Sequence, residues 1–176
     1  MPNSGGSMSR YRTKGQSPRQ RAGFTLVELM VTVAVLAILA MIATPAMQDL
    51  IDANRLAGAS SDLQASLQLA RSEAVRRNSR VTICPSSNGV ACSAAASWSR
   101  FIVHGLDKTA APPVDDVIRD STLAGGVSVS GPAAGIAFKP SGLIDSSQQL
   151  EVTMASNKRC VSVLISGAMS IKKGAC

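Results

Sequence analysis

The stretch LMVTVAVLAILAMIA, Leu29 to Ala43, decides the architecture of this chain of 176 residues, because it is almost wholly apolar. No charged residue lies between Glu28 and Asp49. The whole segment 24–47 is longer than the about 20 residues that a membrane-spanning helix needs. We therefore predict that residues 24–47 cross a membrane.

The segment before this apolar run is basic and polar. Residues 1–23, MPNSGGSMSRYRTKGQSPRQRAG, contain no acidic residue and five basic ones, Arg10, Arg12, Lys14, Arg19 and Arg21. The rest of the chain has 13 basic against 11 acidic residues, so the net charge of +7 is concentrated in this tail. Its content of Gly, Ser, Pro and Gln predicts disorder. Its charge predicts that it stays in the cytoplasm, while everything after Met47 lies outside.

Three interpretations of residues 24–47 compete. A cleaved secretory signal also has a basic and then an apolar region, but here the apolar run is long, begins with an acidic residue and is followed by no clean A-x-A site. A buried core helix would leave the basic tail unexplained. We favour a membrane anchor that continues into the following domain.

A helical pattern continues beyond the predicted membrane segment. Over residues 48–77 apolar side chains recur at helical spacing and form one stripe: Leu56, Leu63, Leu67, Ala70 and Ala74. Asn78 is the expected stop, so residues 48–78 form the amphipathic half of a helix. If the helix is continuous from Phe24, it measures roughly 80 Å at 1.5 Å per residue, and we expect Pro45 to bend it.

After Asn78 the apolar period changes from that of a helix to two, which predicts strands. Turn-forming residues separate these runs and no helical segment alternates with them, which favours antiparallel sheets. Residues 79–176 are therefore expected to form a β-rich globular domain, and the fold class is α+β: a long N-terminal stalk helix packed on small antiparallel sheets. The expected strands cover residues 81–84, 100–103, 116–119, 127–129, 136–138, 150–154 and 160–165.

The four cysteines allow three pairings. None has the C-x2-C spacing of a zinc site, and the single histidine, His104, excludes a multi-histidine metal centre. Proximity favours the disulfides Cys84–Cys92 and Cys160–Cys176, with free buried thiols as the alternative. We expect no metal.

Glu28 is an unusual residue for the edge of an apolar run, because an unpaired charge in lipid is costly. Cleavage between Gly23 and Phe24 would create an α-amine that this carboxylate could neutralise, in the same chain or in a neighbouring copy. The alternative is that the Glu28 side chain reaches the lipid headgroups.

The string GFTLVEL, Gly23 to Leu29, resembles the class III signal of type IV pilins and pseudopilins. In that family a prepilin peptidase cuts after the glycine and methylates the new N-terminal residue. The resemblance implies that Gly23 ends the leader 1–23, that Phe24 becomes N-methylated and that Glu28 acts in assembly.

The resemblance extends into the globular domain. Residues 67–78 (LQLARSEAVRRN), 81–84 (VTIC), 98–103 (WSRFIV) and 138–142 (FKPSG), with the closing Cys160–Cys176 loop, resemble the GspH/FimT family of minor pilins and pseudopilins, and the long leader and cysteine pattern resemble FimU and FimT more than secretion pseudopilins. The family implies a single-pass inner-membrane protein with a periplasmic C-terminal domain. It also implies that the chain joins other pilins or pseudopilins and helps to initiate a type IV pilus or a type II secretion pseudopilus.

An enzyme is the least favoured interpretation, and no cofactor is expected. His104 fits a structural position in or beside a strand, Asp115 and Asp116 fit a loop acid pair, and no phosphate-binding loop is present. We therefore predict that the chain has no catalytic site.

A DNA receptor of natural transformation is the alternative function. In such relatives a Gly-Arg-x-Arg motif carries the contacts, but the corresponding place here, Gly167 to Ser170, has no arginine. Four nearby basic residues are the candidate phosphate contacts: Lys158, Arg159, Lys172 and Lys173. A solvated basic sheet edge is the simpler explanation of these residues.

Overall fold

The structure is a computed structural model that describes residues 23–176. The basic leader therefore lies outside the described residues except for Gly23, and its predicted disorder stays a prediction. The chain divides into two compact units, Met1–Ile42 and Ala43–Cys176, which are considered separately. One helix, α1 (Leu26–Arg76), contributes to both units.

The first unit contains the apolar start of α1. The helix begins after Thr25, whose side-chain oxygen accepts a hydrogen bond of 3.2 Å from the backbone N–H of Glu28. This is the contact that an N-cap residue makes with an otherwise unpaired amide of the first turn. Every described side chain from residue 24 to residue 42 is exposed. By length and composition alone, α1 is able to cross a membrane.

In the second unit the predicted apolar stripe of α1 is confirmed as the buried face of the helix. Leu56 is 3% exposed, and Leu63, Leu67, Ala70 and Ala74 are fully buried. The helix ends at Arg76. Two residues later, Asn78, which was predicted to stop the helix, has a left-handed backbone with a φ of 46°. Such a residue commonly terminates a helix, because asparagine tolerates this conformation better than most residues.

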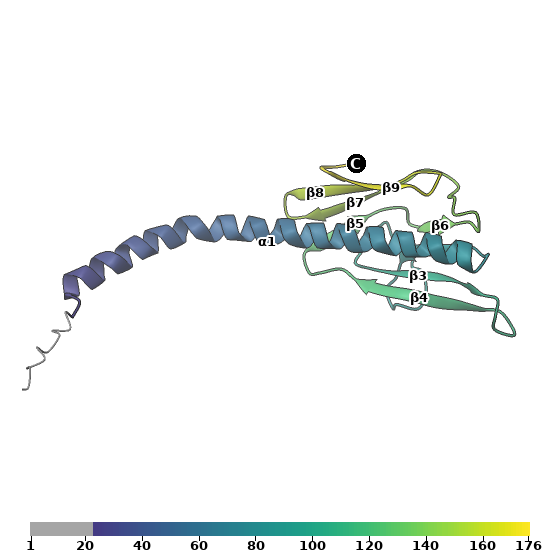
Figure 1. Ribbon diagram of the computed structural model, residues 1–176, viewed down its shortest axis with the longest axis horizontal. Helices are drawn as coiled ribbons and strands as arrows, with labels where there is room; N and C mark the ends of the chain where they lie inside the picture. The colour runs from purple at the N-terminus through teal and green to yellow at the C-terminus, as the bar shows by residue number, and fades with distance from the viewer. Residues whose placement is uncertain (1–22) are drawn as a thin grey trace, which may run out of the picture. The chain divides into compact units, whose positions relative to one another are not determined.

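Nine strands follow the helix, in two sheets whose pairings are all antiparallel. The four-stranded sheet has the order β4-β3-β1-β6 and the five-stranded sheet the order β2-β5-β7-β8-β9. In Figure 1 the helix crosses both sheets, with β7, β8 and β9 on one side of it and β3 and β4 on the other. The strands are β1 (Val81–Pro85), β2 (Ser97–Trp98), β3 (Arg100–Asp107), β4 (Val114–Thr122), β5 (Val127–Ser130), β6 (Ile136–Phe138), β7 (Gln148–Met154), β8 (Asn157–Val163) and β9 (Met169–Lys173).

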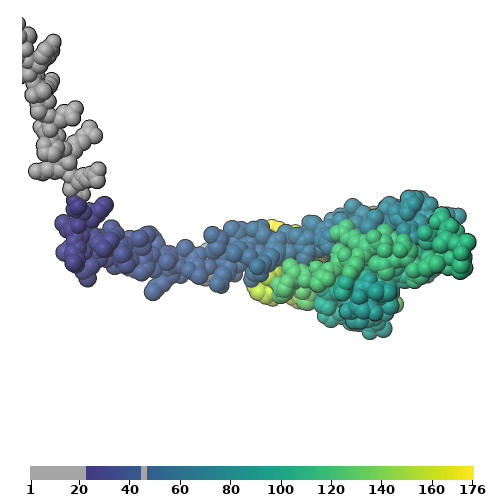
Figure 2. Space-filling view, turned by 90° about the horizontal axis from the view of Figure 1, so that it is seen from below, coloured from purple at the N-terminus to yellow at the C-terminus, as the bar shows by residue number. Residues whose placement is uncertain are grey.

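One apolar core joins the helix to both sheets. The stripe of α1 packs with inward residues of the strands, among which Trp98, Phe101 and Phe138 are fully buried. Figure 2 shows a face on which the helix (blue) borders β4 (green). A contact between these two elements is the hydrogen bond that Arg119 of β4 donates to the carboxylate of Asp62 on the helix.

The strand boundaries differ from the sequence prediction at the C-terminal end. The strand expected over 160–165 runs instead from Asn157 to Val163, because Leu164 begins a turn that Gly167 closes with a φ of 74°. Two further strands were not predicted: β9, which ends in two lysines, and β2, which has two residues. An edge strand with lysines and a strand of two residues lack the apolar alternation by which strands are recognised.

Candidate functional site

The predicted processing and assembly residues lie at the start of α1. Gly23 and Phe24 precede the helix, and the Phe24 side chain is 81% exposed. Glu28 lies in the first helical turn, where a negative charge is favourable because of the helix dipole. Its carboxylate forms no ion pair with any other residue of the described range 23–176.

Thr25 is a residue of this site that the sequence analysis missed. Thr25 and Glu28 have the spacing of a capping box, in which the first residue caps the helix and the fourth is an acidic residue in the first turn. The structure contains the first of the two contacts of that motif, from the Glu28 backbone N–H to Thr25 Oγ1. The T-x-x-E pattern before the apolar run was the available signal.

Both expected disulfides are present. Cys84 pairs with Cys92 across a separation of 8 residues, and Cys160 pairs with Cys176 across a separation of 16. The first bridge attaches the loop after β1 to that strand, and the second attaches the C-terminal residue to β8. Cross-links of this kind stabilise a small domain by restricting its unfolded chain.

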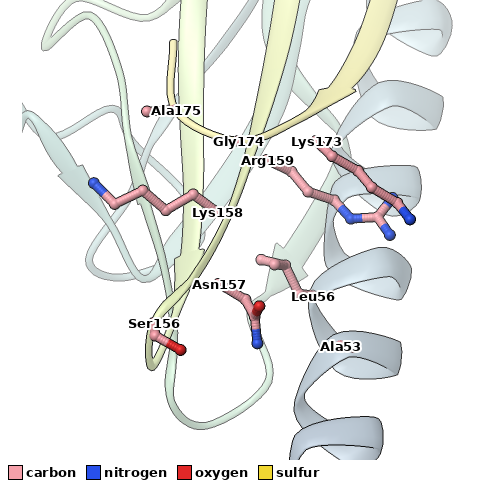
Figure 3. A pocket seen from close by; sticks show the side chains of 9 residues that line it. All are labelled: Ala53, Leu56, Ser156, Asn157, Lys158, Arg159, Lys173, Gly174 and Ala175. Atoms are coloured by element: carbon pink, nitrogen blue, oxygen red, sulfur yellow. The ribbon is translucent and has the colours of Figure 1, made fainter.

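The structure does not bring the four candidate DNA-contacting cations together. Arg159 and Lys173 face each other across the β8–β9 pair, as do Cys160 and Lys172. Since successive strand residues point to opposite faces, Arg159 and Lys173 lie on one face of the hairpin, and Lys158 and Lys172 on the other. In Figure 3, Arg159 and Lys173 extend in the same direction and Lys158 extends away from them.

Only part of this charge is available to an anion. Lys158 Nζ donates a hydrogen bond of 2.8 Å to Glu151 Oε1, and this lysine holds the pKa of the Glu151 carboxyl below its usual range. Arg159 and Lys173 line an open groove of about 430 Å³ beside Ala53 and Leu56 of the helix, together with the paired Lys158 (Figure 3). Two cations that form no ion pair within the described residues make a smaller basic surface at this groove than the four that the sequence suggested.

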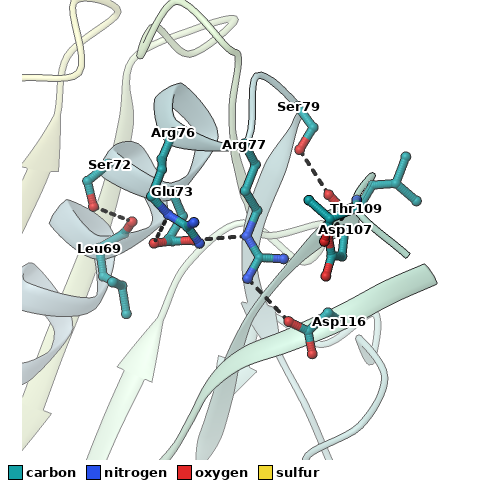
Figure 4. A network of polar contacts seen from close by, with 10 residues as sticks. Leu69, Ser72, Glu73, Arg76, Arg77, Ser79, Asp107, Thr109 and Asp116 are labelled. Atoms are coloured by element: carbon teal, nitrogen blue, oxygen red, sulfur yellow. Dashed lines mark hydrogen bonds and ion pairs between the residues drawn. The ribbon is translucent and has the colours of Figure 1, made fainter. Parts of the chain in front are cut away.

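A polar network fixes the end of α1 to the sheet. Glu73 accepts hydrogen bonds from Arg76 Nε (2.9 Å) and from Arg77 Nε (2.8 Å), and Arg77 Nη2 donates to Asp116 at 3.2 Å (Figure 4). The Arg76 guanidinium, and then that of Arg77, lower the pKa of Glu73 to about 2 although partial burial acts in the opposite direction. Glu73 is thus ionised throughout the physiological range and acts as a structural anion.

The two aspartates that the sequence placed in a loop belong to strand β4, which corrects that expectation. Being adjacent in a strand, they face opposite ways: Asp116 pairs with Arg77, and Asp115 accepts a hydrogen bond from His104 Nδ1. They therefore form no general acid–base dyad.

His104 lies closer to the cysteines than the sequence suggested. Its Nε2 atom is 3.1 Å from Cys92 Sγ, and the sulfur atoms of Cys84 and Cys92 and a ring nitrogen of His104 all lie within 4.8 Å of one another. The disulfide joins the two sulfurs to each other in this structure. No sequence signal indicated this proximity, because the loop that carries Cys92 folds back on β3.

Comparison with known proteins gives two family matches. Residues 59–168 match the model of the family described as Type II transport protein GspH, which is more than half of the chain. Residues 18–44 match the prokaryotic N-terminal methylation motif, which includes Gly23, Phe24 and Glu28. No curated protein sequence matches the chain.

Solved structures of a minor pilin have the same fold. Two crystal forms of the type IV minor pilin FimU of Pseudomonas aeruginosa (strain PAO1) are 18% and 19% identical to this chain, with TM-scores of 0.50 and 0.53. They cover 65% and 68% of this chain and 90% and 89% of the FimU chains. The minor pseudopilin EpsH from the type 2 secretion system of Vibrio cholerae is 13% identical, with a TM-score of 0.48, and covers 65% of this chain and 93% of its own.

Proposed function

Because the chain belongs to the GspH family of minor pilins and pseudopilins and carries an N-terminal methylation motif, we propose that it is an assembly subunit which helps to initiate a type IV pilus or a type II secretion pseudopilus. Prepilin peptidase removes the leader 1–23 after Gly23 and methylates the new N-terminal Phe24. The processed subunit resides in the inner membrane with its globular domain in the periplasm until it joins other pilins or pseudopilins.

In this proposal each part of the chain has a separate task. Residues 24–47 hold the subunit in the membrane and later pack among other stalk helices. Residues 48–78 carry the amphipathic half of the helix, and residues 79–176 present the β-rich surface to the next subunit. The apolar side chains of residues 24–42 support this assignment, because all of them are exposed and an exposed apolar helix requires either lipid or other helices around it.

The observation that carries the proposal is that the Glu28 carboxylate forms no ion pair within the described residues. This carboxylate lies at the edge of a segment with the length and composition of a membrane span. A carboxylate in an apolar environment is stabilised by a nearby cation. The α-amine of a cleaved Phe24, in the same or in a neighbouring subunit, supplies that cation only after processing.

The test compares incorporation of Glu28→Ala with that of the parent chain. We expect the variant to be cleaved and inserted in the membrane but to enter sheared pilus or pseudopilus fractions poorly. Asp49→Ala is the matched control, because it removes an exposed carboxylate from the same helix beyond the apolar segment and should leave incorporation unchanged. Parent-like incorporation of Glu28→Ala would refute the assembly role of this charge.

The family and the solved structures of this fold are structural pilins and not enzymes. Among the described residues, binding of DNA is supported only by Arg159 and Lys173, two cations that face each other across the β8–β9 pair. The positions that would hold the arginines of the receptor motif, Ala168 and Ser170, are exposed and carry no charge. Assembly is therefore the function that we propose.

A further inference from the structure

An exposed cysteine, a histidine and an aspartate contact one another in succession at the four-stranded sheet. Cys92 is exposed, whereas its disulfide partner Cys84 is fully buried. His104 Nε2 lies 3.1 Å from Cys92 Sγ, and His104 Nδ1 lies 3.0 Å from each carboxylate oxygen of Asp115. The three residues come from the loop after β1, from β3 and from β4, so that only the folded chain brings them together.

The two ring nitrogens of His104 have different partners: Nδ1 contacts Asp115, and Nε2 contacts Cys92. A carboxylate accepts only from an N–H group, so Asp115 fixes the proton of His104 on Nδ1 and leaves Nε2 facing the sulfur. The β3–β4 register shifts between Val103 and His104, which is the kind of irregularity that re-aims a side chain next to a functional position. The histidine is therefore oriented by both the strand and the carboxylate.

Two ion pairs lie near these three residues. Arg100 donates a hydrogen bond of 2.7 Å to Asp120 beside the loop that carries Cys92, and Asp116 pairs with Arg77. Asp115 is the acidic group that contacts His104, and His104 is the basic group that contacts Cys92. Within the described residues, His104 is thus the group placed to accept a proton from a Cys92 thiol.

We propose that Cys92 is the entry thiol through which the Cys84–Cys92 bridge is made, with His104 as the group that accepts its proton and Asp115 as a positioning residue. In the dithiol form, Cys92 transfers its proton to His104 Nε2, and its thiolate attacks one sulfur of a disulfide oxidant, either oxidised glutathione or an oxidoreductase disulfide. A mixed disulfide forms on Cys92, and the first thiolate of the oxidant leaves.

Cys84 completes the reaction as the resolving thiol. It loses its proton to solvent, attacks the Cys92 sulfur and expels the second thiolate of the oxidant. The two cysteines lose two electrons, the oxidant disulfide gains them, and the two protons end on the two released thiols. The order follows from exposure, because a bulky oxidant reaches Cys92 but not the buried Cys84.

The second disulfide of the chain is an internal comparison. Cys160 and Cys176 contact Ser162 and the backbone of Leu150, and His104 is the single histidine in the sequence. The Cys160–Cys176 bridge therefore has no imidazole to accept a proton. This inference goes beyond the proposed role in pilus assembly and does not depend on it.

The test uses the full-length chain in detergent, with Cys84→Ser to leave Cys92 as a free thiol. The rate of alkylation by iodoacetamide is measured from pH 5 to pH 10, with the alkylated peptide identified by mass. We expect the midpoint for Cys92 at least about one pH unit below the ordinary value of about 8.5 for a free cysteine. In the same Cys84→Ser background, His104→Gln should return the midpoint toward the ordinary value, and Asp115→Asn should return the midpoint in part. Asp120→Asn is the matched control and should leave the midpoint unchanged.

A second measurement covers the case in which one of these variants disturbs the local fold. The fully reduced parent chain is mixed with oxidised glutathione at pH 6.5, and the closure of both bridges is followed in the same sample. A midpoint one unit lower gives tenfold more thiolate, reduced about threefold by its weaker nucleophilicity, so Cys84–Cys92 should close about threefold faster than Cys160–Cys176. Equal closure rates, or a midpoint for Cys92 that His104→Gln does not move, would overturn the proposal.

Discussion

Arg71 of helix α1 donates a hydrogen bond of 3.1 Å from Nη1 to the carbonyl oxygen of Gly167, a residue 96 positions later in the chain. The same guanidinium donates from Nε to the carbonyl of Gly142 and from Nη2 to that of Ser166. One side chain of the helix thereby holds two turns of the globular domain. Gly167 belongs to the turn before β9.

Replacing Gly167 by alanine should destabilise the globular domain by about 2 kcal/mol or more. Gly167 has a φ of 74°, which is strained for alanine, and an added Cβ would lie 2.3 Å from the carbonyl oxygen of Gly142. Gly174→Ala is the matched control, because Gly174 also has a positive φ of 102° but an added Cβ there meets no described atom within 4 Å. Urea unfolding should show a smaller loss for this control, of about 1 kcal/mol, and equal losses would contradict the account.

Removing the charge of Glu73 should cost about 1–3 kcal/mol at neutral pH. Arg77 is only 13% exposed in its side chain, and Glu73→Gln would leave its guanidinium without the carboxylate that now accepts from Nε. The pKa of Glu73 is lowered from 4.5 to about 2, so its stabilisation is complete above pH 4.5 and is lost as the pH falls toward 2.

The parent and Glu73→Gln stability curves should therefore converge in acid. Denaturant unfolding of a soluble form that lacks residues 1–47, measured from pH 2 to pH 7, checks this. A difference between the two proteins that stays constant over that range would show that the loss comes from packing and not from the charge of Glu73.

Opening the Cys160–Cys176 bridge should lower stability by about 3 kcal/mol, the entropic cost expected for a loop of about this length. The bridge spans a separation of 16 residues and attaches the C-terminal residue to β8. The double variant Cys160→Ser, Cys176→Ser, compared with the parent by thermal unfolding, provides the measurement. An unchanged midpoint would mean that β9 and its hydrogen bonds hold the end of the chain without help.

The fold was more predictable from the sequence than the site was. Local sequence patterns predict the apolar stripe from Leu56 to Ala74 and the strands with period two. These patterns are reliable here because the helix and the strands bury their apolar faces in one common core. The position of His104 beside Cys92 depends on a register shift in β3 and on the path of a loop, neither of which has a local signature.

The basic residues illustrate the same limit. Arg159 and Lys173 lie on the same face of the hairpin because they are partners in the β8–β9 register. Strand β9 was not predicted from the sequence. Without that strand, four nearby cations look like one cluster. With it, they lie on two faces, and Lys158 is already paired with Glu151.

The divided charge predicts weak binding of DNA. A soluble form lacking residues 1–47 should give no low-micromolar complex with duplex DNA at physiological salt, because each face of the hairpin carries only two of the four cations and Lys158 is already paired with Glu151. Each phosphate contact adds only about one unit to the salt slope. Gel-shift titrations at several salt concentrations check this. A tight, salt-sensitive complex that the double variant Arg159→Ala, Lys173→Ala abolishes would support DNA reception, with Lys158→Ala as the control on the other face.

The mass of the mature protein tests the central claim most directly. The full chain is expressed with and without a prepilin peptidase, extracted from the membrane and measured intact by mass spectrometry. We predict that the peptidase removes residues 1–23 and adds one methyl group, which leaves N-methylphenylalanine at Phe24. Removal of the first 46 residues, with a mature chain that begins at Met47, would identify a secretory signal and contradict the account.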